Sequence, residues 1–421
     1  MSQQRNQRNQ RDRLERWLSQ HAGGRPVAIV LGASPNGLSF LRSLGRRGIP
    51  VLLIDADPLV ASFSRYGTSI SIARGPGESE TLTGLLERIG RRLRTPGVLF
   101  STADHYCLML ARHEASLSRY YRFLQPDLAT IEAILDKSTQ YRRAEAAGIP
   151  IPPTFYPTTA DDIEAIAGQV RYPAILKPYQ PDHRPAAMRE KSIKVIHAYS
   201  AQDLRAGFEQ AAALGFQVMV QETIPGDDSH FFGYWGFWDS EGRERAWVTK
   251  RKLRQSPPGF GDGSMQETID APEVAEVSRK LLRAFNYRGF VGVEFKRDPR
   301  DGQLLLIEIN PRTESGNQLA ISAGVDLPWI GYRYLTGQTP AEPEPLSPPF
   351  TPGVVFVNEE WDLKAFLAMR STGTLTLAGW VQSLRGVRSH ALGAWDDPMP
   401  ALVIAGRIAR AAARRTLRLP R

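Results

Sequence analysis

The sequence is poor in the residues that build disulfides and metal clusters, because it has one cysteine and seven histidines among 421 residues. The lone Cys107 excludes an intrachain disulfide and a cysteine-based metal cluster, and it favours a reducing cytoplasm. The histidines show no HExxH-type spacing, which argues against a zinc peptidase. No apolar run is long enough to cross a bilayer, and the first residues lack the apolar core of a signal peptide. We therefore expect a cytoplasmic protein.

The body of the chain also lacks the positive charge that a nucleic-acid-binding protein carries. The net charge is +9, but residues 1–26 contain six arginines against two acids, and residues 402–421 contain six arginines and no acid. The remaining residues are therefore close to neutral, and we expect no nucleic-acid partner.

The two ends of the chain lead to different predictions. Residues 1–26 are polar and basic, and we expect a flexible tail with at most two helical turns around Trp17. At the other end, four arginines recur at steps of three and four residues and would line one helical face: Arg407, Arg410, Arg414 and Arg418. Such a face could contact an anionic membrane or an acidic partner, which would make the protein peripheral to the membrane. In the alternative interpretation, the helix packs on the body and keeps its arginines in water.

Residues 27–128 alternate between short apolar strands and helical stretches. The segment "VAIVLGASPNG" has the pattern of a buried strand and a glycine-bounded turn, and a helical stretch and the strand "VLLIDADP" follow. This rhythm predicts a Rossmann-like α/β domain with a parallel, doubly wound sheet.

Residues 129–340 mix helices with strands that pair in an antiparallel way, an α+β pattern. Short strands and a helix alternate over about 170–222, and longer strands follow around turns at 239–242 and 298–302. Residues 341–421 begin with a stretch rich in Pro and Glu. We therefore expect a linker there, and then a C-terminal extension that ends in the basic helix.

The stretch "LLLIEINPR" interrupts an apolar strand with two polar residues, Glu308 and Asn310. Side chains alternate along a strand, so these two lie on one face. A turn centred near residues 299–300 places Glu308 opposite Gly292, with Glu294 as a diagonal neighbour on the same face. Two carboxylates and an amide on a half-buried surface form an all-oxygen set, which suits Mg²⁺ when phosphates complete the coordination.

An alternative interpretation of this hairpin needs no metal. Glu294 and Glu308 could pair with Lys296 or Arg312 across an ordinary solvated face. In either case Pro311 ends the strand, and Arg312 is delivered just beyond the two carboxylates, where a phosphate or a carboxylate could sit.

Two other segments favour a nucleotide. Lys177 lies among apolar residues in "YPAILKPY", so it needs an anionic partner unless the strand end reaches water. The strand in "VMVQETIPG" ends in residues that could hold an adenine, with an aspartate close by for the ribose. These residues are Gln221, Glu222 and Ile224, followed by Asp227 or Asp228. Taken alone, this segment could equally be a strand and a turn.

Five motifs occur in one order: "DK" before a "GIPIPP" link, then "ILKP", "VQETIPG", "GVEF" and "EINPR". On these motifs, residues 27–340 resemble the carboxylate–amine ligases of the ATP-grasp superfamily. The segments "TKRKLRQSPPGFGDGS" and "NPRTESGNQLAISAGVDLP" look most similar to a branch of predicted carboxylate–amine ligases, and more distantly to D-aspartate ligase. The resemblance implies a two-subdomain ATP-grasp fold with a small lid, behind the Rossmann-like domain.

The resemblance also implies a chemistry, in which ATP phosphorylates a small-molecule carboxylate and a small-molecule amine captures the acylphosphate. Lys137 and Lys177 would bind the ATP phosphates. Two Mg²⁺ ions, with Mn²⁺ as the alternative, would be held by Glu294, Glu308 and Asn310. Arg312 and Lys252 would stabilise the charge in transfer as catalytic residues. A homodimer is a further expectation.

The substrate pocket is less well marked in the sequence. Arg251 and Arg254 alternate around Lys252, so only part of this cluster can face the site. The segments "GASPNG" and "STADHY" add three candidates: Gly32, Asn36 and Asp104. The lid segment "YQPDHRPAAMREKSIK" contains no glycine, unlike many lids of this superfamily. Lys191 or Lys194 would then contact the phosphates, or the segment would order on binding.

Three rival functions stay open at this point. An ATP-grasp kinase would stop at a phosphorylated product, and a nucleotide-binding regulatory protein would bind ATP without turnover. An NAD(P)-dependent oxidoreductase would use "GASPNG" and Asp55, although the second glycine of GxGxxG is missing.

Overall fold

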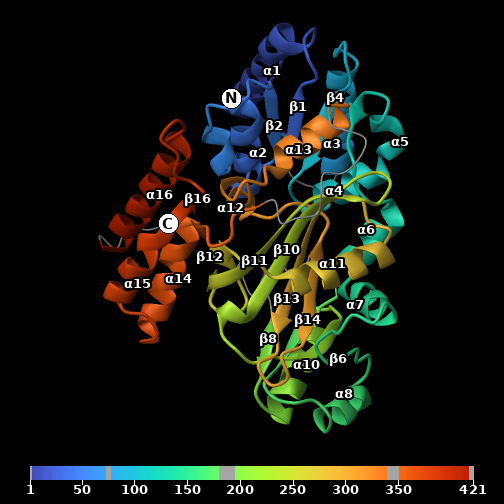
Figure 1. Cartoon of the computed structure of the whole chain (residues 1–421), viewed down its shortest axis with the longest axis vertical. Helices are drawn as coiled ribbons and strands as arrows, with labels where there is room; N and C mark the ends of the chain where they lie inside the picture. Colours follow the sequence, from blue (N-terminus) through green and yellow to red (C-terminus); the bar gives the residue numbers. More distant parts are fainter. Residues whose placement is uncertain (1, 73–76, 180–194, 339–349, 417–421) are drawn as a thin grey trace.

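The computed structural model describes residues 2–72, 77–179, 195–338 and 350–416, and three sheets organise them. A five-stranded sheet forms the N-terminal domain at the top of Figure 1, and a four-stranded sheet forms a small lid at the bottom. A seven-stranded sheet lies between them, with the C-terminal extension on the left. Lys191 and Lys194 lie outside the described residues.

The N-terminal domain is the predicted parallel sheet, with its strands in the order β3-β2-β1-β4-β5. Its strands are β1 Ala28–Leu31, β2 Val51–Asp55, β3 Thr68–Ser71, β4 Gly97–Ser101 and β5 Tyr121–Arg122. The helices between them are α2 Pro35–Arg46, α3 Glu78–Gly90, α4 Asp104–Arg112 and α5 Glu114–Leu117. The alternation of apolar runs with helical stretches therefore led to the correct fold class.

The first residues of the chain form a helix rather than a flexible tail. Helix α1 spans Ser2–His21, and its Trp17 and Leu18 are buried against the N-terminal domain. Leu14, Trp17 and Leu18 recur at helical steps, so they form one apolar stripe that packs on the domain. The prediction of a flexible tail is therefore wrong for residues 9–21.

The lid begins earlier in the chain than predicted. Its sheet has the order β6-β9-β7-β8, and β6 (Thr154–Phe155) pairs with β9 (Val218–Glu222). The other strands are β7 Ala174–Pro178 and β8 Ile196–Ala198, and the helices are α8 Ala160–Ala167 and α10 Ala201–Ala213. Ile163 on α8 belongs to the lid's own hydrophobic core. The lid therefore starts near residue 154 and not near residue 170.

The seven-stranded sheet includes part of the C-terminal extension. Its order is β14-β13-β10-β11-β12-β15-β16, so the last two strands of the chain, β15 and β16, extend one edge. The strands are β10 Phe231–Trp238, β11 Glu244–Ser256, β12 Asp262–Thr268, β13 Gly289–Arg297, β14 Leu304–Asn310, β15 Val355–Val357 and β16 Val387–His390. The extension is therefore not a separate body, and β12, which the sequence analysis missed, is the strand that it joins.

Helices pack on this framework from several parts of the chain. Between the N-terminal domain and the lid lie α6 Leu128–Leu135 and α7 Lys137–Ala146. Helix α11 Pro272–Ala284 lies beside the large sheet, and α12 Asn317–Ser322 and α13 Leu327–Leu335 contact both that sheet and α2 of the N-terminal domain. The extension contributes α14 Glu359–Ser371, α15 Leu377–Ser383 and α16 Met399–Thr416. No described helix combines the length and the apolar character that a membrane crossing requires.

The β13–β14 hairpin has a different register from the one predicted. Glu308 lies directly opposite Glu294, and Asn310 lies opposite Gly292. The turn is longer than assumed, because Asp298 bonds to the backbone of Gln303 and a bulge follows Glu294. The predicted shared face is correct, and the two carboxylates are direct neighbours rather than diagonal ones.

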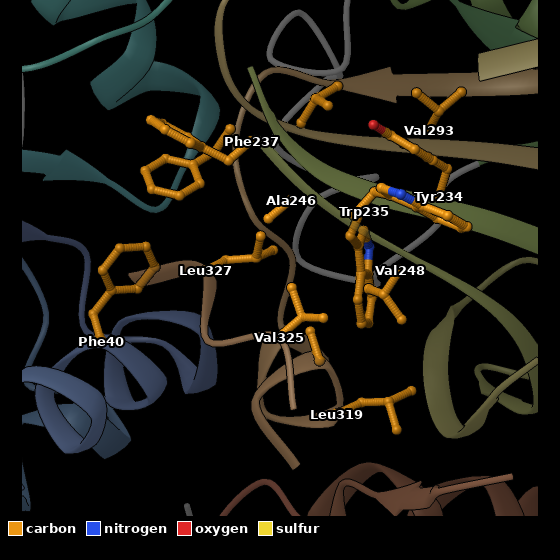
Figure 2. Close-up of a cluster of buried hydrophobic side chains, with 14 of the residues drawn as sticks. Phe40, Tyr234, Trp235, Phe237, Ala246, Val248, Val293, Leu319, Val325 and Leu327 are labelled. Atoms are coloured by element: carbon orange, nitrogen blue, oxygen red, sulfur yellow. The ribbon is translucent and has the colours of Figure 1, made fainter. Parts of the chain in front are cut away.

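One hydrophobic core joins the N-terminal domain to the large sheet. Phe290 on β13 packs against Phe40 of α2 at 5.9 Å and against Phe237 of β10 at 4.8 Å, measured between ring centroids. Figure 2 shows Phe40, Phe237 and Leu327 among the buried side chains of this cluster. Each aromatic pair contributes about 0.5–1.5 kcal/mol beyond its buried area, so the two domains are firmly packed.

Buried ion pairs attach the extension to both domains. Asp397, 1% exposed, accepts from Arg42 Nε at 3.0 Å, from Ser64 Oγ at 2.8 Å and from the Arg65 backbone N–H at 3.0 Å. Arg254 on β11 donates to both oxygens of Asp362 on α14, at 2.9 and 3.1 Å.

We predict that Asp397→Ala lowers the free energy of unfolding by about 3–5 kcal/mol, because it leaves the buried Arg42 guanidinium without its counter-charge. Chemical denaturation of the full chain measures this change. Glu360→Ala is the control, since it breaks an exposed pair with Lys364 and should cost less than about 1 kcal/mol. Equal losses in the two variants would contradict the role assigned to Asp397.

Candidate active site

A cavity of about 510 Å³ lies where the lid, the β13–β14 hairpin and the start of α4 meet. Most of the residues predicted for nucleotide, metal and catalysis line it. They are Lys137, Lys177, Gln221, Glu222, Ile224, Lys252, Glu294, Glu308, Asn310 and Arg312, together with Asp104 from the substrate candidates. Residues from three parts of the fold therefore converge on one space.

The two opposed carboxylates each have a lysine beside them. Lys252 Nζ lies 2.7 Å from Glu294 Oε2, and Lys137 Nζ lies 3.4 Å from Glu308 Oε2. Burial raises the pKa of Glu294 above its ordinary value, although the neighbouring lysines act in the opposite direction. Burial alone would lower the pKa of Lys252, but Glu294 outweighs it and the net shift is upward, so this ammonium stays charged.

The donor atoms on this face fit a hard cation such as Mg²⁺. Glu294 and Glu308 contribute carboxylate oxygens, and Asn310 lies beside them with its amide bonded to Glu308 Oε1 at 3.1 Å. An amide binds a cation through its oxygen, so Asn310 would present Oδ1 to the ion. Among the described residues, no group of three or more His, Cys, Asp or Glu side chains is arranged to hold a metal ion by itself. The set here has two carboxylates and one amide, and it leaves positions for phosphate oxygens and water, as Mg²⁺ sites on nucleotides do.

Lys177 stands on the lid side of the cavity. Its Nζ donates to Gln221 Oε1 at 2.8 Å and to the Tyr141 hydroxyl at 3.0 Å. Burial lowers the pKa of Lys177 from 10.5 to about 8, and Glu308 opposes this shift in part. Both of its hydrogen-bond partners are neutral. An anion such as a phosphate beside the ammonium would stabilise its charged form and oppose the effect of burial on its pKa.

The segment predicted to hold adenine lines the same space. The carbonyl oxygen of Ile224 accepts from Lys296 Nζ at 2.8 Å, and the Gly226 carbonyl accepts from the same atom at 2.9 Å. In the described part of the chain, Thr223 Oγ1 is buried and has no hydrogen-bond partner, although Thr223 lines the cavity. A buried polar atom of this kind is costly unless a ligand satisfies it.

Arg312 connects the hairpin to the N-terminal domain. Its guanidinium donates to both oxygens of Asp104, at 2.7 and 3.3 Å. Burial lowers the pKa of Arg312, but Asp104 outweighs this effect and the net shift is upward. The arginine is therefore a permanent positive charge at the cavity wall, and Asp104 is its partner.

Five predicted site residues do not line the cavity. Asp227 is largely exposed, where it caps the short turn Asp228–His230 and accepts from Ser229. Arg251 faces the opposite side of β11 and pairs with Glu267 at 2.5 Å, because alternate residues of a strand point apart. A bulge after Lys252 turns Arg254 toward α14, where Asp362 holds it.

The two remaining candidates shape the first turn of the N-terminal domain. Gly32 has φ +111, a conformation that other residues adopt with strain. Asn36 is buried, and it donates to the Thr313 carbonyl at 2.7 Å and accepts from Thr313 Oγ1 at 2.8 Å. These predictions of substrate contact are therefore not borne out by the geometry. Asn36 positions the chain beside Arg312, and Gly32 lies against Thr102.

The geometry also argues against the dinucleotide interpretation of this turn. Asp55 Oδ2 accepts from the Ala33 backbone N–H at 2.6 Å, and Asp55 Oδ1 accepts from the Tyr106 hydroxyl at 3.1 Å. Its carboxylate holds the turn in place, which is a structural role rather than ribose recognition.

The sequence analysis missed Lys250, Gln266 and Glu314 at the site, and it named Lys296 only as a possible pairing partner of the two carboxylates. Strand alternation indicates Lys250 and Lys296, because they lie two residues from Lys252 and Glu294. Gln266 is on the overlooked strand β12. Glu314 lies beyond the end of β14, where the chain has no periodic pattern to indicate a side chain's direction.

Comparisons with known proteins agree with this geometry. A family model described as ATP-grasp in the biosynthetic pathway with Ter operon matches residues 237–355. D-aspartate ligase of Enterococcus faecium is 23% identical over 316 residues, which cover 72% of this chain and 74% of the relative. D-alanine–D-alanine ligase of Ralstonia pickettii is 26% identical over 197 residues, or 46% of this chain and 48% of the relative.

Two solved structures have the same fold. N5-carboxyaminoimidazole synthetase of Staphylococcus aureus, complexed with ADP, superposes with a TM-score of 0.59 at 16% identity, covering 76% of this chain and 79% of that one. Biotin carboxylase of Campylobacter jejuni, in a complex with a form of ATP, reaches 0.61 at 16% identity, covering 78% and 74%. These likenesses establish the fold of the chain.

The pKa of Lys177 leads to a test by binding. We predict that the dissociation constant of a non-hydrolysable ATP analogue with Mg²⁺ rises by up to about tenfold per pH unit above pH 8, because Lys177 loses its proton there. Calorimetric titration between pH 6.5 and 9.5 measures it. Lys177→Arg should remove this dependence, whereas Lys364→Arg, at an exposed position, should keep it. A flat wild-type profile would contradict the assignment.

Two arrangements thus meet at one cavity: a lid that carries Lys177, and a large sheet that carries two opposed carboxylates. The matched family model, the ligase relatives and the shared fold together show that the chain is similar to ATP-grasp proteins, and to carboxylate–amine ligases among them.

Proposed function

We propose that the protein is an ATP- and Mg²⁺-dependent ligase that activates a small-molecule carboxylate as an acylphosphate and joins it to an amine. The observation that carries this proposal is the convergence of one carboxylate pair with cations from three elements on a single cavity. Such a wall suits a reaction that moves a phosphoryl group between two anions.

Each group at the cavity has a role in this proposal. Glu294, Glu308 and Asn310 would hold Mg²⁺, which neutralises charge on the phosphates and on the phosphoryl group in transfer. Lys137 and Lys177 bind the ATP phosphates, while Ile224 lies against the adenine with Gln221 and Glu222. Arg312 orients the substrate carboxylate toward the γ-phosphate, and Lys252 stabilises the transferred charge.

The amine substrate distinguishes this function from its rivals. A kinase would release a stable phosphorylated product, and a regulatory protein would bind ATP without producing ADP. In a ligase, hydroxylamine replaces the amine and traps the acylphosphate as a hydroxamate. The screen therefore combines the full chain, MgATP, hydroxylamine and a panel of acids: amino acids of both configurations and aliphatic dicarboxylates. If no acid of the panel yields hydroxamate or ADP, the proposal is overturned.

We predict that Glu308→Gln folds normally but forms hydroxamate at least about 10- to 100-fold more slowly, the range found when even outer partners of a metal ligand are lost. Circular dichroism checks the fold, and ADP release checks the rate. Glu267→Gln, which changes a carboxylate bonded to Arg251 outside the cavity, should keep the wild-type rate. Normal activity of Glu308→Gln would show that Glu308 is not a metal ligand.

We also propose that the end of the chain contacts anionic membranes. Trp395 is 94% exposed, and Met399 and Leu402 on α16 are 50% and 59% exposed. Arg410 follows on the same helix and is exposed, whereas Arg407 stacks over the Phe63 ring on the side where Ile404 packs on the body. Exposed apolar side chains beside arginines suit the interface of an anionic bilayer. A homodimer also remains a prediction, and one solved neighbour, a biotin carboxylase domain of Hydrogenobacter thermophilus, is described as a dimer.

We predict that the protein floats with vesicles of phosphatidylglycerol but not with vesicles of phosphatidylcholine, and that Trp395→Ser with Leu402→Ser abolishes flotation. Sucrose-gradient flotation measures both. Leu367→Ser is the matched control, because Leu367 is an exposed leucine of α14. Equal flotation of all variants would show that Trp395 and Leu402 do not make the membrane contact.

A further inference from the structure

A buried charge pair beside the carboxylates has no role in the proposed transfer of the phosphoryl group. Lys250, 2% exposed, donates to Gln266 Oε1 at 2.8 Å and to Glu314 Oε2 at 3.3 Å. Its Nζ also lies 4.5 Å from the centre of the Trp235 ring. Glu314 and Gln266 line the cavity, so the pair borders the reaction space.

The backbone makes room for this pair at two strands. A Cβ at Gly292 would collide with Glu314 Oε1, and a Cβ at Gly233 would lie 2.5 Å from Lys250 Cε. Residues with side chains would displace both charged groups from these positions. Burying an ion pair is costly and seldom improves stability over apolar packing, which favours a functional reason for this arrangement.

The side-chain amide of Asn310 links Glu314 to the carboxylate pair. Asn310 Nδ2 donates to Glu308 Oε1 and to Glu314 Oε1, at 3.1 Å each. A group held by Glu314 would therefore lie next to the place where Glu308 and its metal hold the phosphates. This position suits the second substrate rather than ATP.

The other carboxylates at the cavity have different roles. Arg312 holds Asp104 through both oxygens, and Glu294 and Glu308 form the opposed pair. Glu222 accepts from the Arg171 backbone N–H at the lid, and Asp262 lies at the exposed start of β12. The lysines and Arg312 suit the two anionic substrates. A cationic amine needs an anion beside this cationic wall, and Glu314 is placed to provide it.

We infer that Glu314 binds the ammonium group of the amine substrate, so that this substrate is a primary amine that is cationic in solution. Lys250 and Gln266 act as positioning residues that hold the Glu314 carboxylate. This inference rests on the proposed ligase function.

The coupling step then balances as follows. The bound ammonium loses one proton to water, and the freed nitrogen lone pair forms a C–N bond to the acyl carbon. The bond between that carbon and the bridging phosphate oxygen breaks, and phosphate leaves with the electron pair. The phosphate also takes a second proton from nitrogen, giving an amide and hydrogen phosphate.

The test compares two nucleophiles on the full chain with MgATP and an acid found in the hydroxamate screen. Hydroxylamine is largely unprotonated at neutral pH and needs no counter-charge, whereas ammonium and the proteinogenic amino acids are cationic at the amine. We predict that Glu314→Gln keeps hydroxamate formation close to wild type but lowers kcat/KM for the cationic amine by roughly 30-fold or more, mainly through KM, because the ammonium loses its counter-charge. Glu314→Asp, which returns a carboxylate, should restore part of this loss.

Controls separate this role from a structural one. Lys250 donates to Glu314, and Asn310 links Glu314 to Glu308; neither Lys250 nor Glu308 changes in this variant. Glu267→Gln should leave both nucleophiles unaffected. A parallel loss with both nucleophiles in Glu314→Gln, or full coupling of the cationic amine, would overturn the inference. Failure of the wild type with every acid and both nucleophiles would instead overturn the proposed function, and the inference with it.

Discussion

Two carboxylates that face each other across one strand pair, Glu294 and Glu308, determine how the surrounding structure is charged. Side chains directly opposite in an antiparallel pair are close neighbours, and like charges there repel. Lys252 from β11 and Lys137 from the start of α7 each lie beside one of the two carboxylates and reduce this repulsion. A divalent cation would meet the same need more strongly, and would free both ammonium groups to contact phosphates.

The site also depends on contacts that cross from one domain to another. Arg312 reaches Asp104 at the start of α4, Thr313 exchanges hydrogen bonds with Asn36, and the Pro311 carbonyl accepts from Cys107 Sγ at 3.3 Å. Three successive residues after β14 are thus each held by the N-terminal domain. The Rossmann-like domain therefore acts as a support for the hairpin end, and Asp55 holds its first turn in place.

Strand periodicity explains which parts of the site could be predicted. Alternation placed Glu308 and Asn310 on one face correctly, because that rule depends only on local backbone geometry. The register was wrong because a turn and a bulge depend on side-chain bonds such as those of Asp298. Glu314 could not be predicted because it lies in an irregular segment, where its direction follows from Gly292 and Lys250 on distant strands. The helix at 9–21 was predictable, since its apolar spacing is visible in the sequence, but its polar composition concealed it.

The attachment of Asp397 has a consequence for how the protein is made. Arg42 lies in the second helix described, yet its buried partner follows it by 355 residues in the sequence. Domains generally fold from the N-terminus onward during translation, so this domain must wait for that later segment before its guanidinium is neutralised. The large sheet is likewise incomplete until β15 and β16 arrive. A prematurely terminated chain would therefore carry an unpaired buried charge and an open strand edge, both of which mark it for removal by cellular quality control.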